Sequence, residues 1–419
     1  MTVRLDCLEN GLRIVTQDAP HLETAALGLW VEAGSRFEAA EINGVSHVLE
    51  HMAFKGTALR SAQDIVEQIE AVGGHLNAYT SREQTAYHAR VLKDDVGLAI
   101  DILADILQHS VFADEELARE REVIVHEIGE AFDTPDDLVF DHFQEAAYPD
   151  QPLGRSILGP VEIVADMPRE ILLDYMAAHY SAPRMVLSAM GRVDHDKIVV
   201  QAAQAFDALA TQNDARQAPA QYVGGERRTT RELEQLHVVM GFDGIAYDDP
   251  DYYVQQVMAQ LLGGGMSSRL FQEVRERRGL AYSVFSFAAS YLDGGTLGIY
   301  AGTSAGQVAE LIPVICGELL RLGETITEDE IARVRAQIKA ALLMAMESPS
   351  ARCEQLARQL LIFGRPLATG EIVEKIEGID TTAIARVAAR TVASGPVSFA
   401  TLGSVANVES YDNLQARFA

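Results

Sequence analysis

The sequence is poor in cysteine, in tryptophan, in basic residues and in long apolar runs. Its three cysteines, Cys7, Cys316 and Cys353, lie far apart and outside any C-x-x-C pattern, which excludes a disulfide framework and a thiolate metal site. No apolar run reaches the roughly 18 residues of a membrane-spanning helix, and the first residues lack the apolar segment of a signal peptide. We therefore expect a cytoplasmic protein in a reducing compartment, with no membrane partner.

Acidic residues are in large excess: 61 Asp and Glu stand against 34 Lys and Arg, a formal net charge of −27 at pH 7. This charge repels a phosphate backbone, so no nucleic-acid partner is expected. Two interpretations of the acidic surface stay open. It keeps a soluble protein in solution, or it attracts basic peptides.

Length and composition indicate a globular protein with more than one domain. Hydrophobic residues make up 48% and charged residues 23% of the 419 residues, and at about 150 residues per domain two or three domains are expected. A polar segment without periodicity, residues 211–229, separates two patterned halves. We predict an N-terminal domain over 1–210, this linker, and a C-terminal domain over 230–419.

The two halves resemble each other. Residues 110–121 align without a gap with residues 324–335, which lie 214 positions further along, and both follow a helical pattern. Residues 67–79 and 273–283 each have the pattern of a helix that glycine ends and a strand follows. Chance similarity of helix ends is the alternative to duplication. The pattern predicts two homologous α+β domains of about 200 residues.

Strands and helices occur in pairs in the first half rather than in strict alternation. This order favours a mixed or antiparallel sheet with helices packed on one face. The expected strands cover 12–16, 24–33, 75–81 and 85–92, and the expected helices cover 44–54, 62–72, 94–109 and 114–132.

The segment His47-Val-Leu-Glu50-His51 has the spacing of a zinc site. On a helix, residues four apart lie within roughly 40° of each other, so both imidazoles can bind one ion with Glu50 beside them. H-x-x-E-H is the inverzincin signature. The alternative is a pair of solvent-facing histidines beside an ion-paired glutamate.

A third ligand has to come from another element. The expected helix 114–132 offers Glu120 and Glu127, which are seven residues apart and so project from the same face. Either one can bind the ion while the other supports a ligand imidazole.

Three segments, GVSHVLEHMAFKGT, GGHLNAYTSREQTAYHARVL and EREVIVHEIGEAFDTPDD, resemble the pitrilysin and mitochondrial processing peptidase family of zinc peptidases, and the resemblance covers essentially the whole chain. It implies a zinc metalloendopeptidase that cuts short or unfolded peptides, presequence-like basic peptides among them. It also implies one Zn²⁺ per chain, held by His47, His51 and Glu127. Glu50 would then be the general base, and Glu120 the supporting acid.

The resemblance implies further site residues. Arg275 and Tyr282, seven apart in the second half, match a pair that stabilises the oxyanion in this family; otherwise they are a surface cation and a sheet residue. Asn77 and Ala78 match residues beside the scissile bond, on a strand whose free edge can accept an extended peptide. Phe54 could line a side-chain pocket near the metal. The alternative for Asn77 is that it caps a turn, and ordinary packing is the alternative for Ala78 and Phe54.

The second half lacks the metal-binding carboxylates. At the offset of 214, Ala341 and Val334 occupy the positions that correspond to Glu127 and Glu120. Only the first half can therefore hold zinc. Gly263-Gly264-Gly265 lacks the G-K-[ST] ending of a phosphate-binding loop, and we expect a hinge or loop there before a helix over 267–277.

The resemblance also bears on assembly. In this family four such domains enclose a peptide chamber, so a chain with two domains forms half of a clamshell, and we expect a homodimer. A heterodimer with a related subunit is the alternative, and so is a non-catalytic peptide-binding or assembly subunit, which would lack a ligand or the general base. Mn²⁺ or Co²⁺ could replace Zn²⁺ in the cell.

Overall fold

The computed structural model describes residues 2–212 and 219–419, and its contacts divide them into two compact units. Unit 1 contains residues 2–129, 156–212 and 343–366; unit 2 contains 130–155, 219–342 and 367–419. The units differ from the predicted contiguous domains 1–210 and 230–419, because each holds one segment from the opposite half of the sequence. None of the helices in the described residues has both the length and the apolar character of a membrane span.

The sheet of unit 1 has six strands, of which β4 forms one edge. In spatial order they are β1 (Val3–Cys7), β2 (Arg13–Asp18), β6 (Met185–Gly191), β3 (Thr24–Val31), β5 (Thr85–Leu92) and β4 (His75–Thr80). β2 and β6 run parallel, and every other neighbouring pair is antiparallel. The sheet is therefore mixed, as expected.

The sheet of unit 2 repeats this topology with five strands. In order they are β7 (Gly225–Thr230), β11 (Ser398–Gly403), β8 (Leu236–Asp243), β10 (Gly295–Thr303) and β9 (Ala281–Ser290). Only β7 and β11 run parallel, so the order and directions match β2-β6-β3-β5-β4 strand by strand. The predicted duplication and α+β class are confirmed.

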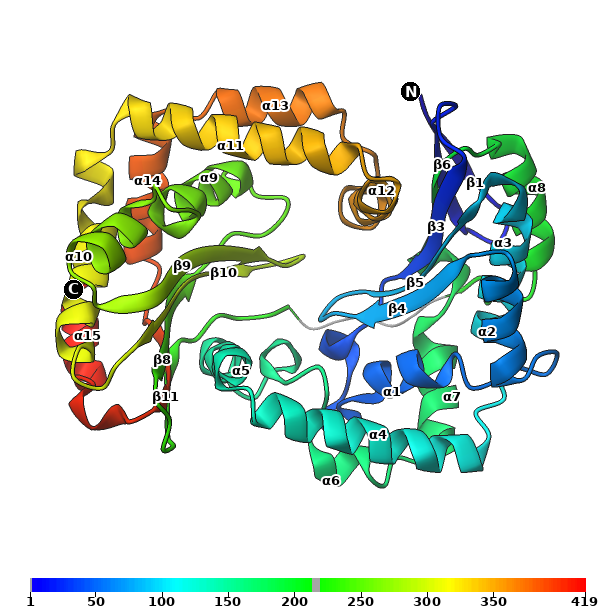
Figure 1. Cartoon of the computed structure of the whole chain (residues 1–419), viewed down its shortest axis with the longest axis horizontal. Helices are drawn as coiled ribbons and strands as arrows, with labels where there is room; N and C mark the ends of the chain where they lie inside the picture. The colour runs from blue at the N-terminus through cyan, green and yellow to red at the C-terminus, as the bar shows by residue number, and fades with distance from the viewer. Residues whose placement is uncertain (1, 213–218) are drawn as a thin grey trace. The chain divides into compact units, whose positions relative to one another are not determined.

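Helices from the first half cover one face of the unit 1 sheet. They are α1 (Val45–Met52), α2 (Ala62–Ala71), α3 (Val96–Gln108), α4 (Asp114–Phe132), α7 (Arg169–His179) and α8 (His195–Ala205), and their apolar residues form one core with Leu27 and Leu29 of β3. On the opposite face, Trp30 packs with Leu356 and Leu360 of α12 (Pro349–Phe363). This second layer, visible in Figure 1, was not expected.

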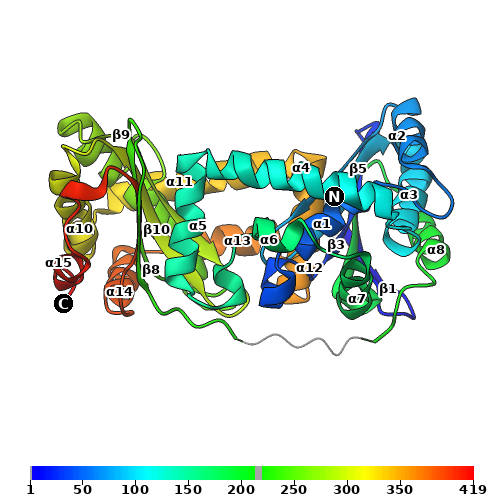
Figure 2. The same cartoon turned by 90° about the horizontal axis from the view of Figure 1, so that it is seen from below.

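Unit 2 has the reciprocal arrangement. One face of the sheet carries α9 (Tyr252–Gly263), a π-helix (Phe271–Arg277), α10 (Val308–Thr325) and α14 (Thr381–Val392). The same half of the sequence also contains α11 (Glu328–Met346), α13 (Thr369–Glu377) and α15 (Tyr411–Ala416). α5 (Pro135–Ala147) covers β8 and β11 on the other face, as Figure 2 shows. α5 and α12 are thus exchanged between the halves.

The exchange follows from two long helices. α4 and α11 each have 19 residues, start 214 positions apart as predicted, and cross the boundary between the units near their C-terminal ends. The helix that follows each of them in the sequence, α5 after α4 and α12 after α11, therefore belongs to the other unit. Shorter elements complete the fold: α6 (Val161–Val164) and the 3₁₀ turns Ser35–Phe37, Ala40–Ile42, Lys93–Asp95, Pro152–Gly154, Ala182–Arg184 and Val405–Asn407.

Two predicted segments need correction. Residues 225–229 of the predicted linker are part of strand β7, which is polar because it is an edge strand, so its sequence has no strand pattern. Residues 213–218 of that linker lie outside the described residues. The predicted helix 267–277 is a π-helix over Phe271–Arg277.

Candidate metal centre

Helix α1 presents the two histidines of the motif, and a carboxylate from outside the helix binds its first turn. At its start Gly44 has φ of +100°, and the buried Glu38 carboxylate accepts hydrogen bonds from the backbone N–H groups of Gly44 (2.7 Å) and Ser46 (2.8 Å). Glu38 thereby caps the helix from outside it. Burial raises the pKa of this carboxyl above its usual value.

The side chains of His47, His51 and Glu127 converge within unit 1. Nε2 of His47 lies 3.7 Å from Oε2 of Glu127, and Nε2 of His51 lies 3.5 Å from the same oxygen. In the part of the chain that the structure describes, these residues are the one group of His, Cys, Asp and Glu whose ligand atoms all lie within 4.8 Å of each other. The geometry brings together the three predicted ligands.

These distances fit a shared ion better than hydrogen bonds. An N–H···O bond is typically about 2.9 Å long, whereas two ligand atoms of a tetrahedral Zn²⁺ site with bonds near 2.05 Å lie about 3.3 Å apart. Burial, followed by the nearby His51, lowers the pKa of His47 to about 4, so its imidazole is neutral at pH 7. Neutral imidazole is the form that binds a metal.

Glu120 contacts His51 on the side away from Glu127. Its Oε2 lies 3.0 Å from Nδ1 of His51, and its Oε1 lies 2.6 Å from Nζ of Lys55. Glu120 therefore lies against the His51 imidazole, where the predicted supporting acid would have to lie. Lys55 was not predicted.

Glu50, the predicted general base, lies half-buried on the same helix. Burial raises the pKa of its carboxyl, while hydrogen bonds from the hydroxyl and backbone N–H of Thr80 act in the opposite direction. Thr80 ends the edge strand β4, so this strand contacts Glu50 directly. Sequence reasoning missed Thr80, since no local pattern links it to Glu50.

The loop that leaves α1 and the loop that enters α4 are joined to each other. Ala58 N–H donates to the carbonyl of His109 (2.9 Å), Val111 N–H donates to that of Gly56 (3.2 Å), and Thr57 forms an isolated bridge with Ser110. Because α1 carries the histidines and α4 the glutamates, this junction sets how the two ligand helices approach.

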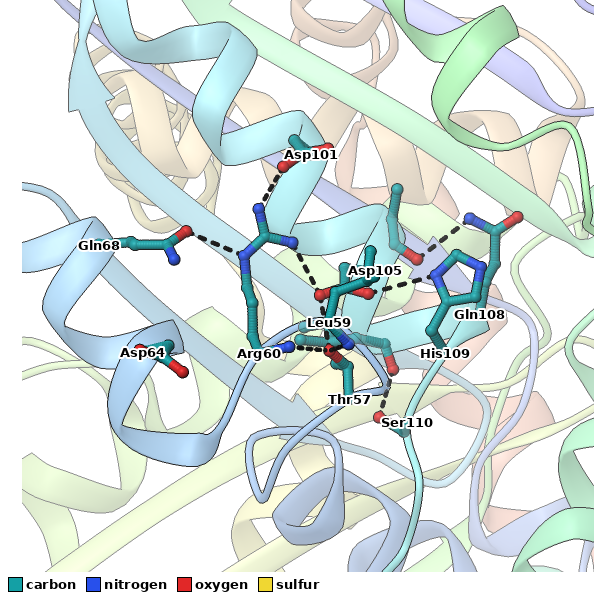
Figure 3. Close-up of polar contacts among 12 residues, drawn as sticks. Thr57, Leu59, Arg60, Asp64, Gln68, Asp101, Asp105, Gln108, His109 and Ser110 are labelled. Carbon is teal, nitrogen blue, oxygen red and sulfur yellow. Dashed lines mark hydrogen bonds and ion pairs between the residues drawn. The ribbon is translucent and has the colours of Figure 1, made fainter.

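Buried Asp105 of α3 stabilises the junction, as Figure 3 shows. Its Oδ2 accepts hydrogen bonds from Thr57 Oγ1 (2.8 Å) and Arg60 Nη1 (2.7 Å), and its Oδ1 lies 3.2 Å from Nδ1 of His109. Arg60 also donates to Gln68 at 2.9 Å and pairs with Asp101. We call Thr57, Arg60 and Asp105 the loop clamp.

The predicted substrate residues lie on or near strand β4. Asn77 is exposed and its Oδ1 accepts a hydrogen bond from Ala78 N–H (2.9 Å), while Ala78 packs against the core of unit 1. Phe54 is half-buried against that core, with its ring 6.4 Å from the ring of Tyr87. Among the described residues β4 is an edge strand with one unpaired side, as an added peptide strand requires.

Arg275 and Tyr282 lie together in unit 2. The Arg275 guanidinium lies 4.8 Å from the ring centroid of Tyr282 and 4.8 Å from that of Phe271. Arg275 belongs to the π-helix and Tyr282 to β9, and three-quarters of the tyrosine surface is exposed.

Similarity to known proteins identifies the family of the chain. Residues 13–161 match the family model "Insulinase (Peptidase family M16)", and residues 166–338 match "Peptidase M16 inactive domain". An uncharacterized zinc protease of Rickettsia felis is 40% identical over 92% of this chain and 94% of its own. The chain belongs to peptidase family M16.

Another relative agrees with this assignment, and a solved structure shares the fold. The probable mitochondrial-processing peptidase subunit beta of Arabidopsis thaliana is 38% identical to this M16 chain, over 99% of it and 81% of the plant protein. The crystal structure of a protease from Helicobacter pylori has the same fold, with a TM-score of 0.89 at 20% identity, and the match covers 96% of this chain and 99% of that one.

In this M16 chain the second half retains the scaffold without the ligands. Val334 is buried in α11 at the position that corresponds to Glu120 in α4, and Ala341 is exposed at the position of Glu127. Alanine and valine cannot bind a metal ion. Within residues 2–212 and 219–419, a metal-binding group is found in unit 1 alone.

Proposed function

We propose that this M16 chain is a zinc metalloendopeptidase that hydrolyses short or unfolded peptides. The observation that supports it most is the convergence of His47, His51 and Glu127 on one point, with the carboxyl group of Glu50 on the same helix. Two neutral imidazole nitrogens and one carboxylate oxygen are a typical donor set of catalytic zinc. The name of the Rickettsia relative, a zinc protease, agrees with this proposal.

When bound at these residues, Zn²⁺ would supply Lewis-acid chemistry, acidifying a water molecule and polarising the peptide carbonyl. Glu50 would accept a proton from the attacking water on its carboxylate and would then deliver it to the amine nitrogen of the leaving peptide. Burial raises the pKa of Glu50 above its usual value, which is the direction that favours a group that first takes and then gives a proton.

The other residues bind and orient. Thr80 fixes the Glu50 carboxyl through its hydroxyl and N–H groups, and the free edge of β4 accepts the peptide backbone as an added strand. We assign to Arg275 and Tyr282 the donation of hydrogen bonds to the oxyanion that develops during attack. These assignments for the arginine and tyrosine rest on the family resemblance.

We propose basic, presequence-like peptides as the substrates. The net charge of −27 favours cationic partners, and the Arabidopsis relative bears the name of a processing peptidase. That name also describes a subunit, which supports a second chain in the active assembly. We propose a homodimer, since one chain contains both the metal ligands and the Arg275–Tyr282 pair; light scattering that finds a stable monomer would contradict it.

The test combines metal analysis with cleavage of a quenched basic peptide, before and after chelation and after return of zinc. We expect about one zinc per chain and cleavage that chelation abolishes and zinc restores. Glu50→Gln should retain zinc and lose about 10²- to 10⁴-fold in turnover. Glu41→Gln, an equal change at an exposed residue outside the motif, is the control. Full activity in Glu50→Gln would refute the mechanism.

A further inference from the structure

A chain of three polar side chains leads away from the metal ligands. Lys55 Nζ lies 2.6 Å from Oε1 of Glu120, and Oε2 of the same carboxylate lies 3.0 Å from Nδ1 of His51. Glu120 is sheltered, with 8% of its side chain exposed, and Lys55 is 31% exposed. A charged pair in such a sheltered position has a more fixed geometry than a pair on the open surface.

This contact decides which nitrogen of His51 is free to bind a metal. A carboxylate oxygen can only accept a hydrogen bond, so Nδ1 of His51 carries the hydrogen and Nε2 keeps its lone pair, directed toward Glu127. His47 has no such support: its Nδ1 is buried without a hydrogen-bond partner among the described residues. His51 is therefore the ligand whose imidazole ring is held in place by other side chains.

The backbone at Lys55 is fixed independently of its side chain. Its N–H donates to the carbonyl of Met52 (3.1 Å), and Gly56 follows with φ of +113°, which turns the chain into the loop clamp. A residue with a side chain would be strained at that φ. Thr57, the next residue, is tied to Asp105. Pairing with Glu120 therefore costs only the conformational entropy of the Lys55 side chain.

We propose that Lys55 is a positioning residue for the metal centre, which holds Glu120 in the orientation that fixes the His51 ring. The proposal rests on the proposed function, because it takes Zn²⁺ to bind at His47, His51 and Glu127. A carboxylate that loses the Lys55 ammonium still reaches His51 but samples other rotamers, so zinc binding weakens.

The test measures zinc affinity of the metal-free protein by competition with a chromophoric chelator, without reference to activity. Glu120→Gln should weaken zinc binding about 10- to 100-fold, the usual effect of losing a partner of a ligand imidazole. Lys55→Met should weaken it about 3- to 10-fold, because Glu120 remains but is no longer held. Lys55→Arg should restore most of the affinity.

The double variant Lys55→Met/Glu120→Gln distinguishes positioning from a general charge effect. If Lys55 acts through Glu120, the double variant binds zinc no more weakly than Glu120→Gln alone. Lys93→Met is the matched control, since Lys93 pairs with exposed Glu23 on the surface of the same unit and should leave zinc affinity unchanged. Thermal unfolding of each metal-free variant verifies that it folds, and Lys55→Gln replaces Lys55→Met if the latter does not.

Two results would overturn the proposal. One is wild-type zinc affinity in Lys55→Met; the other is a double variant whose loss is the product of the two single losses. Failure of the proposed function would look different, because the unaltered chain itself would then bind no zinc at the chelator concentrations used.

Discussion

The loop clamp gives a sharp prediction for stability. Asp105→Ala removes a carboxylate that is 3% exposed and that accepts hydrogen bonds from Thr57 and Arg60. Arg60 keeps its contacts with Asp101 and Gln68, so its guanidinium is not left without partners. The loss is therefore smaller than that of a buried ion pair broken to leave a lone charge.

The magnitude follows from the bonds removed. A hydrogen bond to a charged group contributes about 1.5 to 3 kcal/mol and a hydroxyl bond about 1 kcal/mol, so the free energy of unfolding should fall by about 2.5 to 4 kcal/mol. Asp101→Ala is the control: its carboxylate pairs with the same Arg60 but is 62% exposed, and removing it should cost about 0 to 1 kcal/mol.

Urea unfolding of the metal-free protein measures the difference. Trp30 is the only tryptophan of the chain, and it is buried in β3 of unit 1, the unit that contains Asp105. Its fluorescence therefore reports on the unfolding of this unit. If Asp105→Ala and Asp101→Ala lower the midpoint equally, the clamp contributes no more than a surface ion pair, and the argument for it is wrong.

Two further predictions concern unit 2. Tyr282→Phe should retain zinc and lower the turnover of a quenched peptide by about 10²- to 10³-fold, as expected for a lost oxyanion donor; unchanged turnover would contradict its assigned role. Burial, followed by Arg227, lowers the pKa of His142 to about 4, with Asp141 and Arg231 as its other charged neighbours. The unfolded state then binds more protons between pH 6.5 and 4, so the free energy of unfolding falls as pH falls through this window, by at most about 1.4 kcal/mol per unit from this residue. His142→Gln should reduce that slope in urea titrations at successive pH values, and an unchanged slope would exclude His142 as a cause.

Local sequence patterns determined most elements of this protein. The helix expected over 114–132 and the strand expected over 85–92 match α4 and β5 residue for residue, because each is amphipathic with its own period over many residues. The pairs His47 with His51 and Glu120 with Glu127 could be recognised for the same reason, since helix geometry alone places residues four or seven apart on one face.

Only the tertiary structure decided which of those elements pack against each other. The sequence gives no sign that α5 and α12 are exchanged between the units, because an apolar helix face fits the open face of either duplicated sheet. The cap that Glu38 provides for α1, the contact of Thr80 with Glu50 and the pairing of Lys55 with Glu120 depend on where separate segments meet. Periodicity describes a segment by itself, whereas contacts between distant residues depend on the path of the whole backbone.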